Sequence, residues 1–327
     1  RLEWYDYRSR YTKAYLDYLM LHLVNSTLED VAKKENISSD TIGRVLDTQV
    51  SKSVDWKQFK KLGMLGIDEI AIRKGHNNYL TIITSRVNNK VRIVAILKGR
   101  EKLTVKEFLK SIPARLKRTI KGVCVDMNGG YINAIKETLS KTMIIIDRFH
   151  VAKEYRQCLV DIRKVELTRL RKQLSSKQYK ELKLSISILR RNAELVTKEE
   201  RLELEKIFRK SSKLREGYRL CRKLTSIYNS KYGRRKASQE IDKWILKVGE
   251  SGLKQFDTFI GTLSKYQQHI VNYFKGRHTS GFVEGFNNKI KVIKRRCYGI
   301  FDENSLFRRV FLDTEGYDKY LPKLCVA

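Results

Sequence analysis

The spacing of hydrophobic residues changes from one part of the chain to the next. Between residues 64 and 98, hydrophobic and β-branched residues form three short runs, MLGIDEIAI (64–72), YLTIITSRV (79–87) and KVRIVAILK (90–98). Such runs, separated by short polar segments, are typical of β-strands, and the VNNK sequence between the second and third runs is a hairpin signal. This part of the chain therefore predicts three antiparallel strands.

Helical and strand-like segments alternate in the next part. TVKEFLKSI (104–112) predicts a short helix that Pro113 ends. A strand then ends at Asp126, a helix starts near Tyr131, and TMIIID (142–147) predicts a further strand. Three antiparallel strands followed by alternating helix and strand predict an α/β fold, with a mixed sheet flanked by helices.

From about residue 150 to residue 275 the chain is rich in Lys, Arg, Glu and Leu, without proline or a convincing strand, so long helices are expected. Within this part, residues 234–236 (Arg-Arg-Lys) follow a glycine and are interpreted as a loop near a nucleic acid, or as an ordinary solvated surface. We expect a helical N-terminal region, an α/β domain in two parts, and a helical insertion between those parts. The predicted boundaries are 1–57, 58–155, 156–270 and 271–327.

Residues 1–24 predict a helix, and residues 25–50 predict two more helices joined by a short turn. Ser26 or Thr27 is expected to cap the first of the two, and Ser39 or Asp40 the second. This spacing is typical of a helix-turn-helix, whose second helix enters the major groove of DNA, although an ordinary helical hairpin gives the same pattern. The outward-facing candidates for DNA contact are Thr41, Arg44 and Thr48.

The segment RHTSGFVEGFNNKIKVIKRRC (277–297) predicts one long helix with two different faces. At 100° per residue, the polar face contains an acid among cations and an amide, and the opposite face is apolar. A carboxylate among cations is better explained by metal binding beside phosphates than by solubility. The polar face contains Glu284, Asn288, Lys291 and Arg295, and the apolar face contains Phe282, Phe286, Ile290 and Ile293.

Two further carboxylates are candidates for the same site. Asp68 interrupts an apolar strand, where a charge is costly unless it is paired or bound to a cation. The alternative is a salt bridge to Arg73 or Lys74, and the neighbouring Glu69, on the opposite face, is expected to be such a structural acid. Three acids from two strands and a helix make a two-metal phosphodiester site plausible.

Asp126 ends a strand, which is where an open α/β sheet places its functional groups. Considered alone, it is equally well explained as a helix cap or turn former before Asn128, and Gly129 and Gly130 are interpreted as turn residues. Considered with Asp68 and Glu284, it is better explained as a catalytic residue.

Asp147 also ends a predicted strand and lies three residues before His150. The two side chains share a face if a helix begins at once. They are candidates to support the site, to contact DNA or only to cap the following helix.

The chain has 327 residues and a formal net charge of +33, which indicates a polyanionic partner and favours nucleic acid. No stretch of about 20 apolar residues is present, and no signal peptide is recognised, so no membrane role is expected. The five cysteines are scattered without a CxxC pair, which argues for a reducing compartment and against zinc bound within this chain. Walker, GxGxxG and GxSxG motifs are also missing from the sequence.

Four ordered motifs and the helix-turn-helix resemble transposases of the ISL3 insertion-sequence family, which belong to the DDE group with an RNase H-like catalytic domain. The motifs are GIDEIAIRKGHNNYLTIITS (66–85), VCVDMNGGYINAIKETL (123–139), IIIDRFHVAKEYR (144–156) and GFVEGFNNKIKVIKRRCYGI (281–300).

The resemblance implies that Asp68, Asp126 and Glu284 are the catalytic and metal-binding triad. It also implies two Mg²⁺ ions per active site, which Mn²⁺ can replace, with Asp68 bridging both. Lys291 and Arg295 would hold DNA phosphates, and Asp147 with His150 would form a D-x-x-H element.

The resemblance further implies double-stranded DNA as the partner, both as transposon ends and as target. A homodimer on paired ends, in the bacterial cytoplasm at the nucleoid, is expected. Family members often carry an N-terminal zinc module, which is expected to lie upstream of Arg1 if it exists. The alternatives are an inactive, domesticated DNA-binding regulator and a structure-specific nuclease with the RNase H-like fold.

Overall fold

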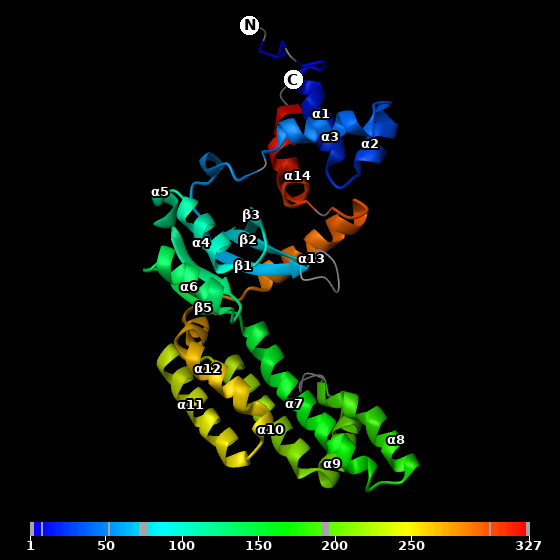
Figure 1. Cartoon of the computed structure of the whole chain (residues 1–327), viewed down its shortest axis with the longest axis vertical. Coiled ribbons are helices and arrows are strands. Elements are labelled where there is room, and N and C mark those ends of the chain that lie inside the picture. The colour runs from blue at the N-terminus through cyan, green and yellow to red at the C-terminus, as the bar shows by residue number, and fades with distance from the viewer. Residues whose placement is uncertain are drawn as a thin grey trace. The chain divides into compact units, whose positions relative to one another are not determined.

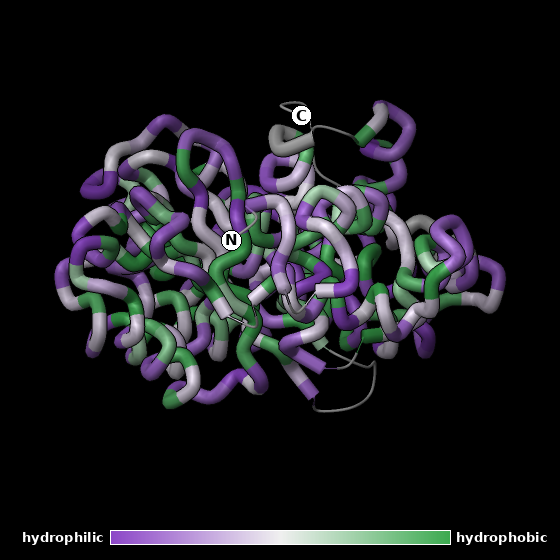
Figure 2. The backbone as a smooth tube through the Cα atoms, turned by 90° about the horizontal axis from the view of Figure 1, so that it is seen from above, coloured by the Kyte–Doolittle hydropathy of each residue, from purple (hydrophilic) through white to green (hydrophobic). Residues whose placement is uncertain are grey.

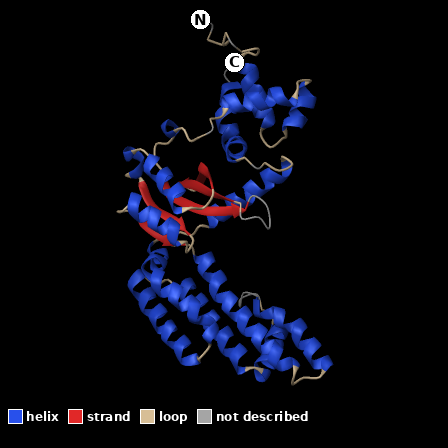
Figure 3. Ribbon diagram, in the orientation of Figure 1, coloured by secondary structure: helices blue, strands red, loops and turns tan. Residues whose placement is uncertain are grey.

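The computed structural model describes residues 3–7, 9–51, 53–71, 78–190, 196–300 and 302–324. The chain forms two compact units. The first contains residues 1–144 and 280–327, and the second, which we call the helical unit, contains residues 145–279. Figure 3 shows the strands gathered in one sheet, whereas the described part of the helical unit, after the last two residues of β5 (Met143–Ile146), consists of helices and their connections.

The sheet has the strand order β3-β2-β1-β4-β5 (Figure 1). β1 pairs with β2 and β2 with β3 in antiparallel fashion, whereas β1 pairs with β4 in parallel. The expected mixed sheet is thereby confirmed, and the β2–β3 turn contains Asn88 and Asn89 at positive φ (49° and 64°), as a tight hairpin requires. The strands are β1 (Gly63–Ala71), β2 (Tyr79–Val87), β3 (Lys90–Lys98), β4 (Ile120–Val125) and β5 (Met143–Ile146).

Helices cover both faces of the sheet in the first unit. α4 (Lys102–Ser111) and α6 (Gly129–Thr138) pack together, with the short α5 (Ala114–Lys117) between them in the chain. The opposite face packs against α13 (Gly281–Arg296) and α14 (Glu303–Leu324), in an apolar cluster. From the sheet this cluster contains Ile70, Leu80, Ile82, Ile93 and Ile96, and from the helices Phe286, Ile290, Ile293, Leu306, Phe307 and Val310.

The N-terminal region is a three-helix unit that packs on α14. α1 (Lys13–Leu23), α2 (Leu28–Glu35) and α3 (Ser39–Gln49) enclose an apolar core to which α14 adds Leu312 and Tyr320. The predicted helix over residues 1–24 was too long, because α1 begins only after its cap at Thr12. Thr27 caps α2 as expected, but Ser38, rather than Ser39 or Asp40, caps α3 by accepting a hydrogen bond from the Thr41 amide.

A buried network of charged residues on α14 connects these elements. The Asp313 carboxylate is fully buried and accepts hydrogen bonds from Arg309, Arg296 and the Asn25 amide. Arg309 also donates to the carbonyl oxygens of Leu23 and Ser26, at the end of α1. Burial lowers the pKa of the Arg309 guanidinium, and the charge of Asp313 opposes this shift. Asp313 therefore joins the N-terminal helices to α13 through α14.

The helical unit is built from long helices, as the sequence predicts. Residues 234–236 do not form the expected loop, because α11 begins at Arg234. Among the described residues no helix is long and apolar enough to cross a membrane, and hydrophilic residues interrupt the hydrophobic ones along the chain in Figure 2. The helices are α7 (Arg148–Arg171), α8 (Ser176–Ser185), α9 (Lys198–Lys210), α10 (Ser212–Asn229), α11 (Arg234–Ser251) and α12 (Asp257–Ile270), with 3-10 turns η2 (Ile186–Arg190), η4 (Lys254–Phe256) and η5 (Val271–Lys275); η1 (Trp56–Gln58) precedes the sheet.

Replacing Asp313 with Ala is expected to lower the free energy of unfolding by about 3–5 kcal/mol, because it leaves the buried Arg309 without its carboxylate. Asp318→Ala is the matched control, since its ion pair with Lys90 is exposed on both sides and is expected to contribute much less. Urea unfolding followed by circular dichroism measures both variants. Equal decreases in the two variants would contradict a central role for Asp313.

Candidate active site

Asp68 is held in place at both of its carboxylate oxygens. It lies half-buried on β1, where its Oδ1 accepts the Glu69 amide at 2.8 Å and its Oδ2 accepts the Asn287 side-chain Nδ2 at 2.8 Å. The carboxylate is thus oriented by one backbone donor and one side-chain donor. Arg73 and Lys74, its alternative partners, lie outside the described residues.

Asp126 follows the end of β4, the strand that pairs with the Asp68 strand. β1 and β4 pair in parallel as far as Gly66 opposite Cys124, and Asp68 and Asp126 each follow two residues later, with Asp126 directly after the end of β4. Neighbouring strands are about 4.8 Å apart, and paired residues of a parallel ladder point to the same face. Two of the three predicted acids therefore lie at the same edge of the sheet, one on β1 and one directly after β4.

Asp126 also forms the turn that the alternative interpretation predicted. Its Oδ1 accepts the Asn128 amide at 3.1 Å, and the Asn128 side chain then caps α6 by accepting the amides of Gly130 and Tyr131. Gly129 and Gly130 are accordingly the first residues of the helix and not turn residues before it. This turn fixes the Asp126 carboxylate at the end of β4. Asp126 can therefore form the turn and also belong to the site.

Glu69 is a structural acid on the opposite face of the sheet, as predicted, although its partner is Arg100, at 3.4 Å, and not Arg73 or Lys74. On this face Tyr131 is buried and its hydroxyl lies 2.9 Å from the Thr81 hydroxyl. Burial raises the pKa of Tyr131, and the negative charges of Glu69, Asp126 and Asp68 raise it further. Tyr131 therefore stays a neutral phenol within the electrostatic influence of both candidate acids.

The helix α13 has the two faces that the sequence predicts. Glu284 is in its first turn and exposed, as are Asn288, Lys291 and Arg295, and Lys291 Nζ lies 3.4 Å from the Asn288 side-chain oxygen. The apolar face is packed against the sheet. Glu284 therefore shares its face with cations that are free to approach a phosphate backbone.

The first turn of α13 lies unusually close to β1. A Cβ atom built on Gly66 would lie 2.1 Å from the Val283 side chain and 3.0 Å from the Phe282 ring. Gly66 points to the same face as Asp68, because strand residues two apart share a face. The missing side chain at Gly66 allows α13 to approach, so that Asn287 reaches Asp68.

The three predicted acids do not form a single metal-binding cluster among the described residues. Among the described residues, no group of three or more His, Cys, Asp or Glu side chains is placed to hold a metal ion. Asp68 lies on β1 and Asp126 directly after the adjacent β4, whereas Glu284 is exposed on the helix that contacts Asp68 through Asn287. Glu284 is therefore connected to the aspartates through the backbone of α13, which carries both Glu284 and Asn287. The three acids do not share one metal-binding position in the described structure.

Asn287 is a site residue that the sequence did not single out. Its side chain is 4 % exposed, and although Nδ2 donates to Asp68, its buried Oδ1 has no hydrogen-bond partner in the described structure. Asn287 lies beside the apolar stripe, four residues after Val283 and three before Ile290. A polar residue on the packed edge of a helix is the signal that identifies it.

The predicted DNA-reading residues lie on α3. Arg44 and Thr48 are exposed and Thr41 is half-buried, and none contributes to the core of the three-helix unit. Thr41 shares a hydrogen bond with Ser38 at 2.9 Å, and the Thr48 hydroxyl donates to the Val45 carbonyl. α14 supports this helix from behind, because Arg308 pairs with Asp47.

Asp147 and His150 belong to the helical unit. Asp147 is buried at the N-cap position of α7, its side chain makes no cap hydrogen bond, and its Oδ2 lies 4.0 Å from His150 Nε2. That distance is too long for a hydrogen bond and permits an ion pair when the imidazole is protonated. Their role as supporting residues stays a prediction.

A mixed sheet with one acid on its first strand and another directly after its fourth, together with a helix-turn-helix, is consistent with an RNase H-like domain of the DDE class. A family model described as "Transposase", for the DDE transposases of the ISL3 family, matches residues 65–310. A second model, the helix-turn-helix domain of transposase family ISL3, matches residues 1–50. The chain belongs to the ISL3 family of insertion-sequence transposases.

Curated relatives agree with this family. The chain is 27 % identical over 312 residues to the transposase for insertion sequence element IS1001 of Bordetella parapertussis, covering 95 % of this chain and 75 % of the relative. It is 23 % identical over 343 residues to the transposase for insertion sequence element IS1557 of Mycobacterium tuberculosis, covering 98 % and 75 %. The chain is therefore a DNA-binding enzyme of the transposase type, and its DDE domain implies dependence on divalent metal ions.

Replacing Gly66 with Ala is expected to push α13 away from β1, because the new methyl group would overlap Val283. Overpacking of this kind costs about 1–3 kcal/mol of stability. The exposed Gly285, where a Cβ meets nothing within 4 Å, provides the control Gly285→Ala. Thermal unfolding and DNA cleavage would be measured together, and wild-type cleavage by Gly66→Ala would contradict the importance of the close approach.

Proposed function

We propose that the protein binds the ends of an insertion sequence, cleaves the DNA there and joins the freed 3′-OH to target DNA, with Asp68, Asp126 and Glu284 as the catalytic acids. The observation that carries this proposal is the position of Asp68 on β1 and of Asp126 directly after the adjacent parallel strand β4, with Asp68 bonded to the helix that carries Glu284. The proposed domain boundaries are those expected from the sequence.

The donor set fits hard divalent cations. Carboxylate oxygens are the ligands that Mg²⁺ and Mn²⁺ prefer, and the buried Oδ1 of Asn287 is a further uncharged oxygen beside Asp68. When bound, a pair of such ions lowers the pKa of an attacking water and stabilises charge on the leaving oxygen. We propose Mg²⁺ as the natural ion, with Mn²⁺ as a substitute.

Each part of the chain has a distinct task in the proposed reaction. Asp68, fixed by the Glu69 amide and by Asn287, presents both carboxylate oxygens, and Asp126 presents its own from the neighbouring strand. Glu284 joins them from the first turn of α13. On the same helix face, Lys291 and Arg295 hold the phosphates of the strand being cut, because cations beside a phosphodiester position it electrostatically.

The helix α3 is proposed to read the transposon end in the major groove, with Thr41, Arg44 and Thr48 facing the bases or the backbone. We further propose a homodimer on paired ends, because joining requires two DNA termini held together. Analytical ultracentrifugation with and without end DNA tests the stoichiometry.

Replacing Asp68, Asp126 or Glu284 with its amide (Asp→Asn, Glu→Gln) is expected to slow cleavage by about 100-fold or more, because each change removes a charge that holds the metal ions. Binding of end DNA should be unchanged. Glu69→Gln is the matched control, since Glu69 neighbours Asp68 on the opposite face. Assays on labelled end DNA with Mg²⁺, Mn²⁺ or EDTA measure cleavage and joining separately.

Full cleavage and joining by Glu284→Gln would remove that residue from the site. Binding without any metal-dependent cleavage by the wild-type protein would instead favour a regulatory DNA-binding protein. Cleavage of branched DNA without joining would favour a structure-specific nuclease.

Asn287→Ala is expected to raise the Mn²⁺ concentration for half-maximal cleavage by about 10- to 100-fold, as removal of a group that orients a metal ligand typically does. Asn288→Ala, which changes the exposed neighbour, is the control. Mn²⁺ binding followed by electron paramagnetic resonance gives a readout independent of turnover. An unchanged Mn²⁺ affinity in Asn287→Ala would show that Asn287 only packs the helix.

A further inference from the structure

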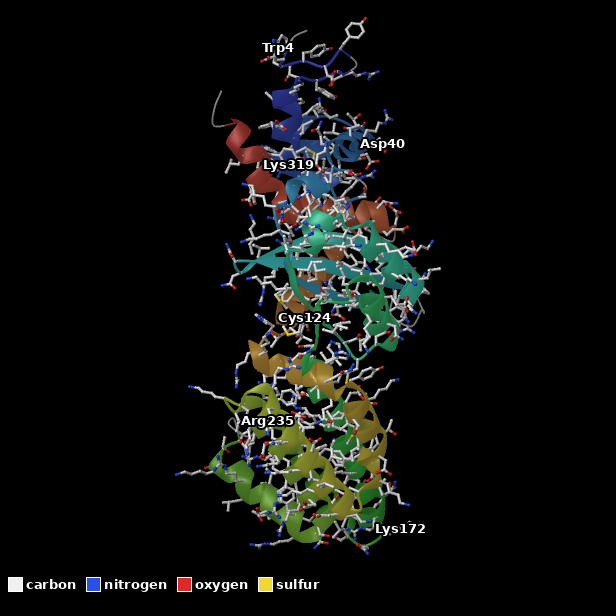
Figure 4. All side chains as sticks on the ribbon, turned by 90° about the vertical axis from the view of Figure 1, so that its left-hand side faces the viewer. Trp4, Asp40, Cys124, Lys172, Arg235 and Lys319 are labelled. Carbon is white, nitrogen blue, oxygen red and sulfur yellow. The ribbon has the colours of Figure 1, made fainter. Side chains whose placement is uncertain are left out.

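A group of cations gathers at one end of the helical unit, where α11 begins. Arg235 is labelled at this end in Figure 4, and Lys172 is labelled at the opposite end of the same unit. Most members of the group are exposed, and Arg148 is half-buried. We call this surface the basic end, and it comprises Arg148, Lys231, Arg234, Arg235, Lys275 and Arg277.

Hydrogen bonds join the segments of the basic end into one surface. Arg148, at the start of α7, donates to the Tyr273 hydroxyl at 3.3 Å and to the Asn229 side chain at the end of α10. Arg277, after η5, donates to the Ser230 carbonyl, just before α11. The start of α7, the connection from α10 to α11 and the end of η5 therefore lie together.

Few acids compensate the basic end, and on the α7 segment Asp147, which directly precedes Arg148, is buried. No Asp or Glu occurs between Glu216 and Glu240, or between Asp257 and Glu284. Within the described structure, none of Lys231, Arg234, Arg235, Lys275 and Arg277 forms an ion pair with a carboxylate. Charges of one sign placed together destabilise the folded chain unless an anion neutralises them.

Folding does not explain these cations. α11 opens with Arg234, Arg235 and Lys236, although cations are unfavourable at the positive end of a helix dipole. The N-cap residue is Gly233, which has no side chain to cap the helix, and the space around it is open. At the other end of the unit, Arg171 and Lys172 lie at the C-terminus of α7, where the dipole favours positive charge. The basic end thus opposes local stability, which indicates selection for a ligand.

We propose that the basic end is a second DNA-binding surface, which contacts the phosphate backbone of duplex DNA without reading its sequence. The surface is broad, drawn from three segments, and made largely of exposed arginine and lysine, which suits a line of phosphates better than a single small anion. It belongs to the helical unit, whereas α3 and the three candidate acids belong to the first unit, so it adds phosphate contacts to those that recognise the end. The proposal rests on DNA binding alone and does not require the catalytic assignment.

The test compares two variants of the full chain that carry the same reduction in charge. The first replaces Lys231, Arg234, Arg235 and Lys275 with Gln, and the control replaces Arg171, Lys172, Lys177 and Lys180 with Gln. All eight side chains are exposed. Fluorescence anisotropy measures binding to end DNA and to a scrambled duplex of the same length, from about 50 to 200 mM salt, the range in which neutralised phosphates dominate the salt dependence.

For the basic-end variant, the slope of log K against log salt is expected to become less steep by about 0.9 for each phosphate that the variant no longer neutralises, equally for both duplexes. The control variant should keep a slope close to that of the wild type. Equal slopes in the wild type and the basic-end variant, or equal changes in both variants, would overturn the proposal. An unchanged DNA slope together with weaker binding to an acidic protein would assign the surface to another partner and would also overturn it.

A thermal unfolding measurement separates binding from folding. Removing cations from the first turn of α11 should leave the midpoint unchanged or raise it slightly, since the helix dipole opposes them. A midpoint that falls by several degrees would show that these residues stabilise the helical unit, and the proposal would then fail.

Discussion

The contact between α13 and β1 is the constraint on which the site depends. The proposed site combines an acid on a helix with two acids of the sheet. Such a site requires that the distance and the rotation of the helix relative to the sheet be fixed. Gly66 sets the distance, because no side chain fits between β1 and Val283. Asn287 sets the rotation, because its amide reaches the Asp68 carboxylate from the packed side of the helix. The exposed face with Glu284 follows from these two contacts.

The position of the N-terminal helices is fixed by specific contacts as well, and these contacts come from α14. Apolar packing alone tolerates sliding, whereas Arg309 and Asp313 must keep their partners, since an unpaired buried charge is costly. These two residues engage the end of α1 and, through Arg296, the last turn of α13. Arg308 holds Asp47 on α3 in a similar way. The helix proposed to read DNA and the helix that carries Glu284 are therefore attached to one common support.

Much of this architecture could be predicted from the sequence, and the failures have physical causes. β2 and β3 were predicted to the residue, because β-branched runs bounded by Asn-Asn leave little freedom of register. The start of α1 was missed because aromatic residues before Lys13 resemble a helical face without forming one. The placement of Asp68 and Asp126 on and directly after neighbouring strands follows from strand order, but Asn287 acquires its role only when β1 and α13, distant in the chain, come together.

The two units of the chain use their charged residues differently. The first unit places its few site acids on the sheet and one helix, and it pairs internal carboxylates with arginines, Asp313 with the buried Arg309 and Glu315 with the half-buried Arg92. In the helical unit, many cations instead stay exposed, and at the start of α11 they oppose the helix dipole. Paired internal cations stabilise the fold, whereas unpaired external ones raise the free energy of the free protein and lower that of a complex with a polyanion. The net charge of +33 therefore lowers the stability of the free protein and strengthens its binding to DNA.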